Sequence, residues 1–269
     1  LPKNSFVAIN GFTCYAVYKA ITAANYKADY IDIGNSDLNF SSRALQAKLD
    51  DNPNIKVLII QNTLGYPCDV EEISRVCEKR KIILIEDLAH SIGTKYQDKN
   101  EAGTVGDFTI LSFSQDKMVD GISGGALIIR NDRYKNLDKL ELSNLNNKQQ
   151  LQDRFYPLFT FLIKTTYSFG FGKLLHAILK RYKFLSLPMG SNNNLTRLPN
   201  WYSHLIMEQL DNLNTNLNHR RNIASIYAQN ISSEILLQEM VEGISLSTNL
   251  RFPILVDGRN NLLNFLKSC

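Results

Sequence analysis

The sequence is poor in the features that mark several specialised classes of protein. Only 14 glycines and 7 prolines occur among 269 residues, which excludes a collagen-like or low-complexity chain. Charged residues make up 21% of the chain and hydrophobic residues 44%, and these globular values exclude a wholly disordered chain. The four cysteines contain no C-x-x-C pair, so neither a zinc ribbon nor a thioredoxin motif is indicated. Because no signal peptide is visible, we expect reduced thiols and a cytoplasmic protein.

Acidic residues are missing from one long segment. Between Arg154 and Met207 no Asp or Glu occurs, whereas the same stretch contains seven bases. The remainder has 23 bases and 26 acids, so the formal net charge of +4 arises in this one segment. A net charge of this size does not by itself indicate a nucleic-acid-binding protein.

The two ends of the sequence are unusual. The chain begins with Leu1 rather than Met, and residues 261–269 have the pattern of a helix that is still continuing. We therefore expect a fragment of a longer protein, truncated at both ends.

Apolar runs and helical patterns alternate through the first half of the chain. We predict strands over 6–9, 28–33, 56–61, 82–86, 108–113 and 126–130, and helices over 14–24, 41–49 and 70–79. Continuous apolar strands separated by helices predict an α/β protein with a mainly parallel sheet covered on both faces. Ligands bind at the carboxyl ends of the strands in such sheets.

The second half has a different pattern. Residues 144–152 are polar and indicate a loop or the start of a helix, and residues 188–200 are a linker rich in Gly, Asn and Pro. A long amphipathic helix or a helix pair is predicted over 201–231, and a late strand over 250–256.

Two carboxylates end the buried strand at 82–86. Asp87 follows that strand directly, and a carboxylate at this point can bind a cationic nitrogen of a ligand. Asp also commonly caps a helix that follows a strand. The local sequence alone favours the helix cap.

A lysine follows the next strand. Lys117 lies in a loop that also contains Ser112 and Ser114, so it could form a Schiff base while the hydroxyls bind phosphate. The alternative is an ordinary solvated lysine. Two further segments each indicate only a turn when taken alone: Gly124-Gly125, and 65–69, which is followed by a helix cap.

Together these elements favour one site. An acid after one strand and a lysine after the next can face the same crevice. This is the arrangement that holds pyridoxal phosphate, with lysine on the aldehyde carbon, an acid on the pyridine nitrogen and hydroxyls on the phosphate.

Through these motifs the sequence resembles the DegT family of pyridoxal-phosphate-dependent sugar-nucleotide aminotransferases, which have the aspartate-aminotransferase fold. The order and spacing agree over most of the chain, and the combination of motifs is specific although each one alone is weak. The matching segments are 12–14, 30–33, 65–69, 85–94, 103–107, 112–117 and 124–125, with weaker matches at Arg197, 209–210 and 220–221.

The resemblance implies two catalytic residues. Lys117 would bind the cofactor as a Schiff base and then move the proton between the amino-acid α-carbon and the cofactor. Asp87 would pair with the pyridinium nitrogen and keep the ring protonated. Related sugar dehydratases carry histidine in place of this lysine, so Lys117 favours transamination over dehydration.

Four further cofactor-binding residues are implied by the resemblance. His90 would lie near the phenolic oxygen, Ser112 would hydrogen-bond the phosphate and Thr13 would line the pocket. Cys14 stands where the family commonly has an aromatic residue. The asparagine that the family sends from the neighbouring subunit falls at or beside Asn194.

The resemblance also implies an architecture and partners. Residues 1–187 would form a three-layer α/β/α large domain of fold type I that binds pyridoxal phosphate, with 154–187 as a basic aromatic helical insertion. Residues 188–269 would form a linker, a long helix and part of a smaller α+β domain. The implied substrates are a keto-sugar nucleotide and an amino-acid donor, by family habit glutamate, in surface polysaccharide or deoxyamino-sugar biosynthesis. Active sites shared across a homodimer are expected.

Two alternatives remain open. One is a catalytically degenerate or regulatory homologue that binds the cofactor without turnover. The other is a nucleotide-binding α/β module, although no G-x-G-x-x-G follows the first strand. No metal site is predicted, since His176, His204 and His219 lack metal-ligand spacing.

The basic aromatic segment 154–187 has three interpretations. These are helices that pack on the large domain or on a partner subunit, a binding site for the diphosphate of a nucleotide-sugar, and a helix that lies on an anionic membrane surface. The longest uncharged run of the segment is the nine residues 155–163, shorter than the roughly 18 to 20 that a membrane span needs. Aromatic and basic residues also interleave in single-strand nucleic-acid binders, but no RNP-type motif accompanies them here, so no nucleic-acid partner is predicted.

Overall fold

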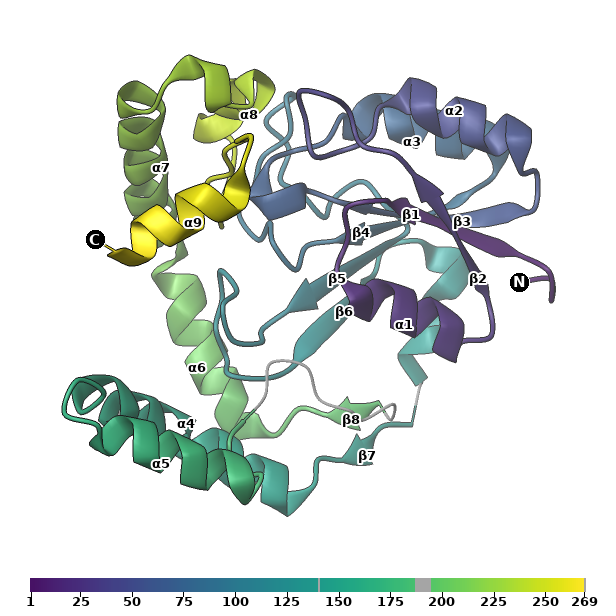
Figure 1. Ribbon diagram of the computed structural model, residues 1–269. Helices are drawn as coiled ribbons and strands as arrows, with labels where there is room; N and C mark the ends of the chain where they lie inside the picture. The colour runs from purple at the N-terminus through teal and green to yellow at the C-terminus, as the bar shows by residue number, and fades with distance from the viewer. Residues whose placement is uncertain (140, 187–194, 269) are drawn as a thin grey trace.

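The computed structural model describes residues 1–139, 141–186 and 195–268, and its centre is a six-stranded sheet (Figure 1). The strands lie in the order β2-β1-β3-β4-β5-β6, and all neighbouring pairs are parallel except β5 and β6. The mainly parallel sheet predicted from the apolar runs is confirmed. The strands are β1 Phe6–Asn10, β2 Lys27–Ile31, β3 Ile55–Gln61, β4 Ile83–Asp87, β5 Phe108–Ser112 and β6 Gly125–Ile129.

Helices cover both faces of this sheet, as the continuous apolar strands predicted (Figure 1). Helices α2 (Ser42–Asp51) and α3 (Val70–Arg80) pack on one face, where Leu45 and Ile73 are fully buried against Leu58. Helix α1 (Tyr15–Ala23) lies on the other face, with Ile21 in a cluster of strand residues. Side chains alternate between the two faces along each strand, so β3 supplies both clusters.

The predicted cap of α3 is confirmed. The Asp69 side chain accepts a hydrogen bond from the Glu72 N–H, and the acids Glu71 and Glu72 occupy the first turn, where they complement the helix dipole. The preceding segment contains η1 (Thr63–Gly65). A Cβ on Gly65 would lie 1.8 Å from the Thr248 hydroxyl oxygen, so glycine permits the close approach of the C-terminal part of the chain.

The second half of the chain is largely helical. The predicted helix pair over 201–231 is present as α6 (Asn200–Asp211) and α7 (Leu213–Asn230), and the segment 144–152 contains the start of a helix at Asn147. Helices α6 and α7 bury residues beside the loop that follows β5. The remaining elements are η2 Asp132–Lys139, β7 Ser143–Asn144, α4 Asn147–Thr165, α5 Phe171–Arg181, β8 Thr196–Arg197, η3 Ser233–Ile235, α8 Gln238–Glu242, η4 Gly243–Ser245 and α9 Arg259–Ser268.

The prediction of a strand over 250–256 is wrong. This segment is irregular, and it is tied to its neighbours by isolated backbone bonds, from Leu250 N–H to Leu64 O at 2.9 Å and from Leu255 N–H to Ile235 O at 2.8 Å. Both acceptors lie in 3₁₀ segments rather than in strands. A β-ladder needs a second extended segment alongside, and the described residues supply none here.

Helices α4 and α5 form a hairpin that lies away from the sheet (Figure 1). The turn closes tightly, since a Cβ on Gly172 would lie 2.3 Å from Ile163 O. Among the described residues, no helix has the length and apolar character needed to cross a membrane.

Candidate active site

The two carboxylates at the end of β4 have different environments. Glu86 is fully buried and accepts four hydrogen bonds, from the Tyr96 hydroxyl at 2.7 Å and from the backbone N–H groups of Gly103, Val105 and Gly106 at 2.6, 2.8 and 2.6 Å. Buried backbone donors need acceptors, and a carboxylate supplies enough lone pairs for all of these. Glu86 therefore holds the loop of the G-x-x-G-D motif in place.

The aspartate of that motif completes the connection. Asp107 accepts a hydrogen bond from the Leu84 N–H at 2.9 Å, and its other oxygen accepts one from the Asn131 amide at 2.5 Å. The loop and β4 therefore hold each other through side chains on both sides. The bond to Leu84 holds the start of β4 against the loop.

Asp87 is placed at the carboxyl end of β4, beside Gln61 of β3 and Ile110 of β5 in the register of the sheet. One carboxylate oxygen, Oδ1, accepts a hydrogen bond from the Ala89 N–H at 2.9 Å. The other, Oδ2, accepts none from the residues that the structure describes. Residues 89–93 form turns rather than a helix, so the helix-cap interpretation of Asp87 is wrong.

Burial raises the pKa of Asp87 above its ordinary value, while the Ala89 N–H and the charge of Lys117 act in the opposite direction. The desolvated carboxylate is therefore a favourable partner for a cation or a cationic N–H group.

Lys117 lies in a loop that is fixed by its neighbours. Met118 and Val119 are buried in two different apolar clusters, against α7 and α6. The Gly121 N–H donates to Phe113 O at 2.9 Å and closes the loop across its base. The Lys117 side chain is consequently half-buried in the pocket described next, and the interpretation as a fully solvated lysine is wrong.

These residues meet in one pocket of about 320 Å³ at the carboxyl ends of β3, β4 and β5. Four of the predicted site residues line it: Asp87, His90, Ser112 and Lys117. The other lining residues are Cys14, Ala16, Val17, Ala20, Ile59, Gln61, Ala89, Ile110 and Ser114. The position agrees with the rule that open α/β sheets bind ligands outside the carboxyl ends of their strands.

Two hydroxyls lie together on one side of this pocket. The Oγ atoms of Ser112 and Ser114 are 3.2 Å apart, and either can donate to the other. Both can reorient to donate to an anionic oxygen, which suits a phosphate group.

His90 is half-buried in the same pocket. Burial lowers the pKa of its imidazole to about 4, and the positive charges of Lys117 and Arg251 act in the same direction. His90 is therefore neutral near pH 7 and has one donor and one acceptor nitrogen available to a ligand. Its backbone carbonyl accepts a hydrogen bond from the Thr248 hydroxyl at 2.8 Å.

Thr13 lies beside the pocket but is not among its lining residues. Its hydroxyl donates to Gln61 Oε1 at 2.7 Å, and Gln61 Nε2 donates to Phe12 O at 2.6 Å and to Thr63 Oγ1 at 3.1 Å. Gln61 therefore links the ends of β1 and β3, the two strands between which the order of the sheet reverses.

Sequence reasoning missed Gln61. The available signal was a polar residue at the end of an otherwise apolar strand, in line with Asp87 on the neighbouring strand. The remaining predicted site residue, Asn194, lies outside the described residues.

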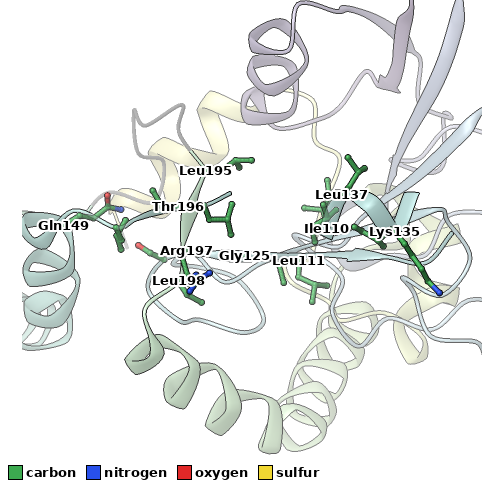
Figure 2. Close-up of a pocket in the computed structure, with 17 residues that line it drawn as sticks. Ile110, Leu111, Gly125, Lys135, Leu137, Gln149, Leu195, Thr196, Arg197 and Leu198 are labelled. Atoms are coloured by element: carbon green, nitrogen blue, oxygen red, sulfur yellow. The ribbon is translucent and has the colours of Figure 1, made fainter. Parts of the chain in front are cut away.

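A second and larger cavity, of about 1000 Å³, lies on the other side of β5 (Figure 2). Residues 195–198 border it opposite β5, β6 and η2. Of the lining residues that the structure describes, Ile110 alone is shared with the pocket that contains Lys117. Its charged lining residues are Lys135 and Arg197, and the Lys135 side chain points away from the others in Figure 2. Among the described residues no carboxylate lines this cavity, so the acid and lysine pair is found in the smaller pocket.

Comparison with solved structures defines the fold class. A sugar aminotransferase from Micromonospora echinospora superposes with a TM-score of 0.69 at 16% identity, covering 99% of this chain and 65% of that one. The protein therefore has the three-layer α/β/α fold of the type I pyridoxal-phosphate-dependent transferases, as its sequence predicted.

Sequence comparison defines the family. The model of the DegT/DnrJ/EryC1/StrS aminotransferase family matches residues 3–269, and the chain belongs to this family. It is 31% identical over 152 residues to a UDP-4-amino-4,6-dideoxy-N-acetyl-beta-L-altrosamine transaminase from Campylobacter jejuni. This match covers 56% of this chain and 40% of that protein. It is 27% identical over 133 residues to a GDP-perosamine synthase from Escherichia coli O157:H7, covering 49% and 35%. The chain thus matches well under two thirds of the length of these relatives.

Proposed function

We propose that the protein is a pyridoxal-phosphate-dependent aminotransferase that moves an amino group from glutamate to a keto-sugar nucleotide. The observation that carries this proposal is the convergence of Lys117 and Asp87, from different strands, in one pocket. Family membership makes amino transfer the expected reaction.

The residues of the pocket fit the three recognition points of this cofactor. Lys117 supplies an amine for the aldehyde, and Ser112 and Ser114 supply hydroxyls for the phosphate. Asp87 supplies a carboxylate with one oxygen free of bonds to the described residues, which suits a protonated ring nitrogen. The apolar lining from Val17 and Ile59 suits the faces of an aromatic ring.

When bound, the cofactor supplies an electron sink for the carbanion formed at the amino-acid α-carbon. Asp87 keeps the ring nitrogen protonated, because a buried carboxylate is stabilised by a cationic partner. Lys117 would hold the cofactor, and its Nζ would accept and return a proton. His90, which is neutral near pH 7 and lines the pocket, would orient the ring through a hydrogen bond.

The substrates in this proposal are supported by the relatives. One is named for a UDP-linked amino-sugar and another for GDP-perosamine, so an amino-sugar nucleotide is the product class that we propose here. We also propose a homodimer, with Asn194 supplied to the partner's site, from the resemblance to the family.

The test is the transfer of nitrogen from ¹⁵N-labelled glutamate to a panel of UDP-, GDP- and dTDP-linked keto-sugars. The wild-type protein should label at least one of them, and Lys117→Ala should abolish labelling. Lys135→Ala is the matched control, since Lys135 borders the other cavity and pairs with Asp132 on the surface. Cofactor binding without labelling of any substrate would support a degenerate homologue instead. A Lys117→Ala variant as active as the wild type would contradict the proposal.

A further inference from the structure

We propose that the α4–α5 hairpin, residues 147–186, docks the protein on an anionic membrane surface. The surface consists of the exposed faces of α4 and α5 and the turn between them (Figure 1). The proposal is independent of the reaction proposed above, because no residue of the hairpin lines the pocket around Lys117.

One end of the hairpin is anchored to the body of the protein. Asp153 is almost completely buried and accepts hydrogen bonds from the Ser186 hydroxyl at 2.5 Å and from the Tyr202 hydroxyl of α6 at 2.6 Å. Gln115, in the loop of Lys117, donates to the Ser186 hydroxyl at 3.1 Å. These contacts fix the base of the hairpin and leave its far end projecting.

The hairpin exposes large apolar side chains on both helices and in its turn. Phe169, in the turn, has 87% of its surface exposed, and Tyr182 has 72%. Along α5 the exposed residues recur every three or four positions, so they form one stripe on the helix: Phe171, Leu174, Ile178 and Tyr182. A second exposed stripe on α4 contains Leu151, Phe155 and Leu158. Apolar exposure of this density marks an interaction surface.

The charge of the hairpin has one sign. It contains seven bases, and all are exposed: Lys148, Arg154, Lys164, Lys173, Lys180, Arg181 and Lys183. Its only acid is Asp153, which is used at the base. None of the seven bases forms an ion pair with another described residue. The surface therefore presents an uncompensated positive potential.

An anionic bilayer satisfies both properties at once. Aromatic and aliphatic side chains enter the boundary between headgroups and acyl chains, while lysine and arginine remain among the anionic headgroups. Binding along the surface, rather than across the membrane, agrees with the absence of a spanning helix among the described residues. A sugar-nucleotide diphosphate would require the bases to converge, yet the groove between α4 and α5 is lined by only one of them, Lys164.

The test is co-sedimentation of the purified protein with phosphatidylcholine vesicles that contain either no anionic lipid or about 30 mol% phosphatidylglycerol. The protein should bind the anionic vesicles and not the neutral ones, and added salt should release it. Two variants address the two properties of the hairpin: Phe169→Ala with Leu174→Ala, and the triple change Lys173→Gln, Lys180→Gln and Arg181→Gln. Each should lower the bound fraction at least about fivefold.

Matched variants control for general effects of composition. Phe265→Ala with Leu266→Ala removes an exposed Phe and Leu from α9, and Lys19→Gln, Lys79→Gln and Lys95→Gln remove three exposed lysines elsewhere. These should bind vesicles like the wild type, and far-ultraviolet circular dichroism should show that all variants are folded. Absence of binding to anionic vesicles would overturn the proposal, as would equal binding by the hairpin variants. The proposal would also be overturned if the protein did not bind vesicles and sedimentation velocity showed a dimer that depends on the hairpin.

Discussion

Two adjacent carboxylates on β4 show how much the position of a residue decides its role. Glu86 and Asp87 differ by one methylene group, but side chains alternate along a strand, so they face different surroundings. Glu86 is enclosed by four donors, whereas Asp87 lies at the pocket with one oxygen unbonded by the described residues. The first is suited to a structural role and the second to binding a cationic group.

The variant Asp87→Asn should weaken the binding of pyridoxal phosphate. A hydrogen bond to a charged group contributes roughly 1.5–3 kcal/mol, so we expect an affinity about ten- to a hundredfold lower. Titration of the protein with the cofactor, followed by its visible absorbance, measures the change. Asp69→Asn, at the cap of α3 and outside the pocket, should leave the affinity unchanged. Equal affinity of Asp87→Asn and wild type would contradict the role of Asp87.

His90 should make folding stability depend on pH. Its pKa of about 4 in the folded protein lies below the ordinary value of 6.5, so between these values the unfolded chain binds more protons. His90 therefore contributes stability that is fully present above pH 6.5 and is lost as the pH falls towards 4. Between pH 7 and pH 5 the wild type should lose about 1 kcal/mol more than His90→Gln, allowing for solvent screening.

Urea unfolding at the two pH values measures this difference. The exposed His219 supplies the control, and His219→Gln should follow the wild type. Parallel losses in His90→Gln and wild type would show that the imidazole is not held neutral by burial.

At the scale of elements, the loop over 103–107 depends on β4. If Glu86 is replaced by Ala, the Tyr96 hydroxyl and the N–H groups of Gly103 and Gly106 lose their acceptor in the interior, and a third, partly buried N–H group loses its acceptor as well. Each buried donor left without a partner costs about 1–3 kcal/mol, so we expect Glu86→Ala to lower the free energy of unfolding by roughly 3 kcal/mol or more. Tyr96→Phe removes only one donor of this network and should cost less. Chemical denaturation measures both changes, and a cost for Glu86→Ala within about 0.5 kcal/mol, as for a surface substitution, would contradict this role.

The sequence predicted elements best where the local pattern determines the outcome. The run at 56–61 has a continuously apolar centre and the length of a strand, and the predicted strand is found. Residues 250–256 are also largely apolar, but they contain Pro253, which cannot donate a ladder hydrogen bond, and they lack a neighbouring strand among the described residues.

The candidate site could be predicted from the sequence only where it depends on the order of strands and loops. Asp87 and Lys117 follow predicted strands, so the topology of a parallel sheet brings them together. The contact between Thr13 and Gln61 joins residues 48 positions apart and depends on the register of β1 and β3, which sequence patterns do not specify. For the same reason the buried role of Glu86 appears only in the structure.

At the scale of the whole molecule, the net charge has a structural basis. The α4–α5 hairpin over 147–186 carries seven bases and one acid, whereas the rest of the chain carries 23 bases and 25 acids, so the positive net charge arises in the hairpin. The body and the hairpin meet at Asp153, Ser186 and Gln115, two residues from Lys117. The division into domains at 187/188 stays a prediction, because its boundary falls among residues outside the described ranges.

The central claim is that the pocket between β3, β4 and β5 holds pyridoxal phosphate through Lys117. The most direct measurement is reduction of the protein with borohydride in the presence of the cofactor, followed by peptide mass spectrometry. We expect a visible absorbance band that reduction removes, and a pyridoxyl group on the peptide that contains Lys117. The Lys117→Ala variant should carry no such group, whereas Lys135→Ala should be modified at Lys117 like the wild type. Modification of a different lysine, or no modification of the wild-type protein, would contradict the account.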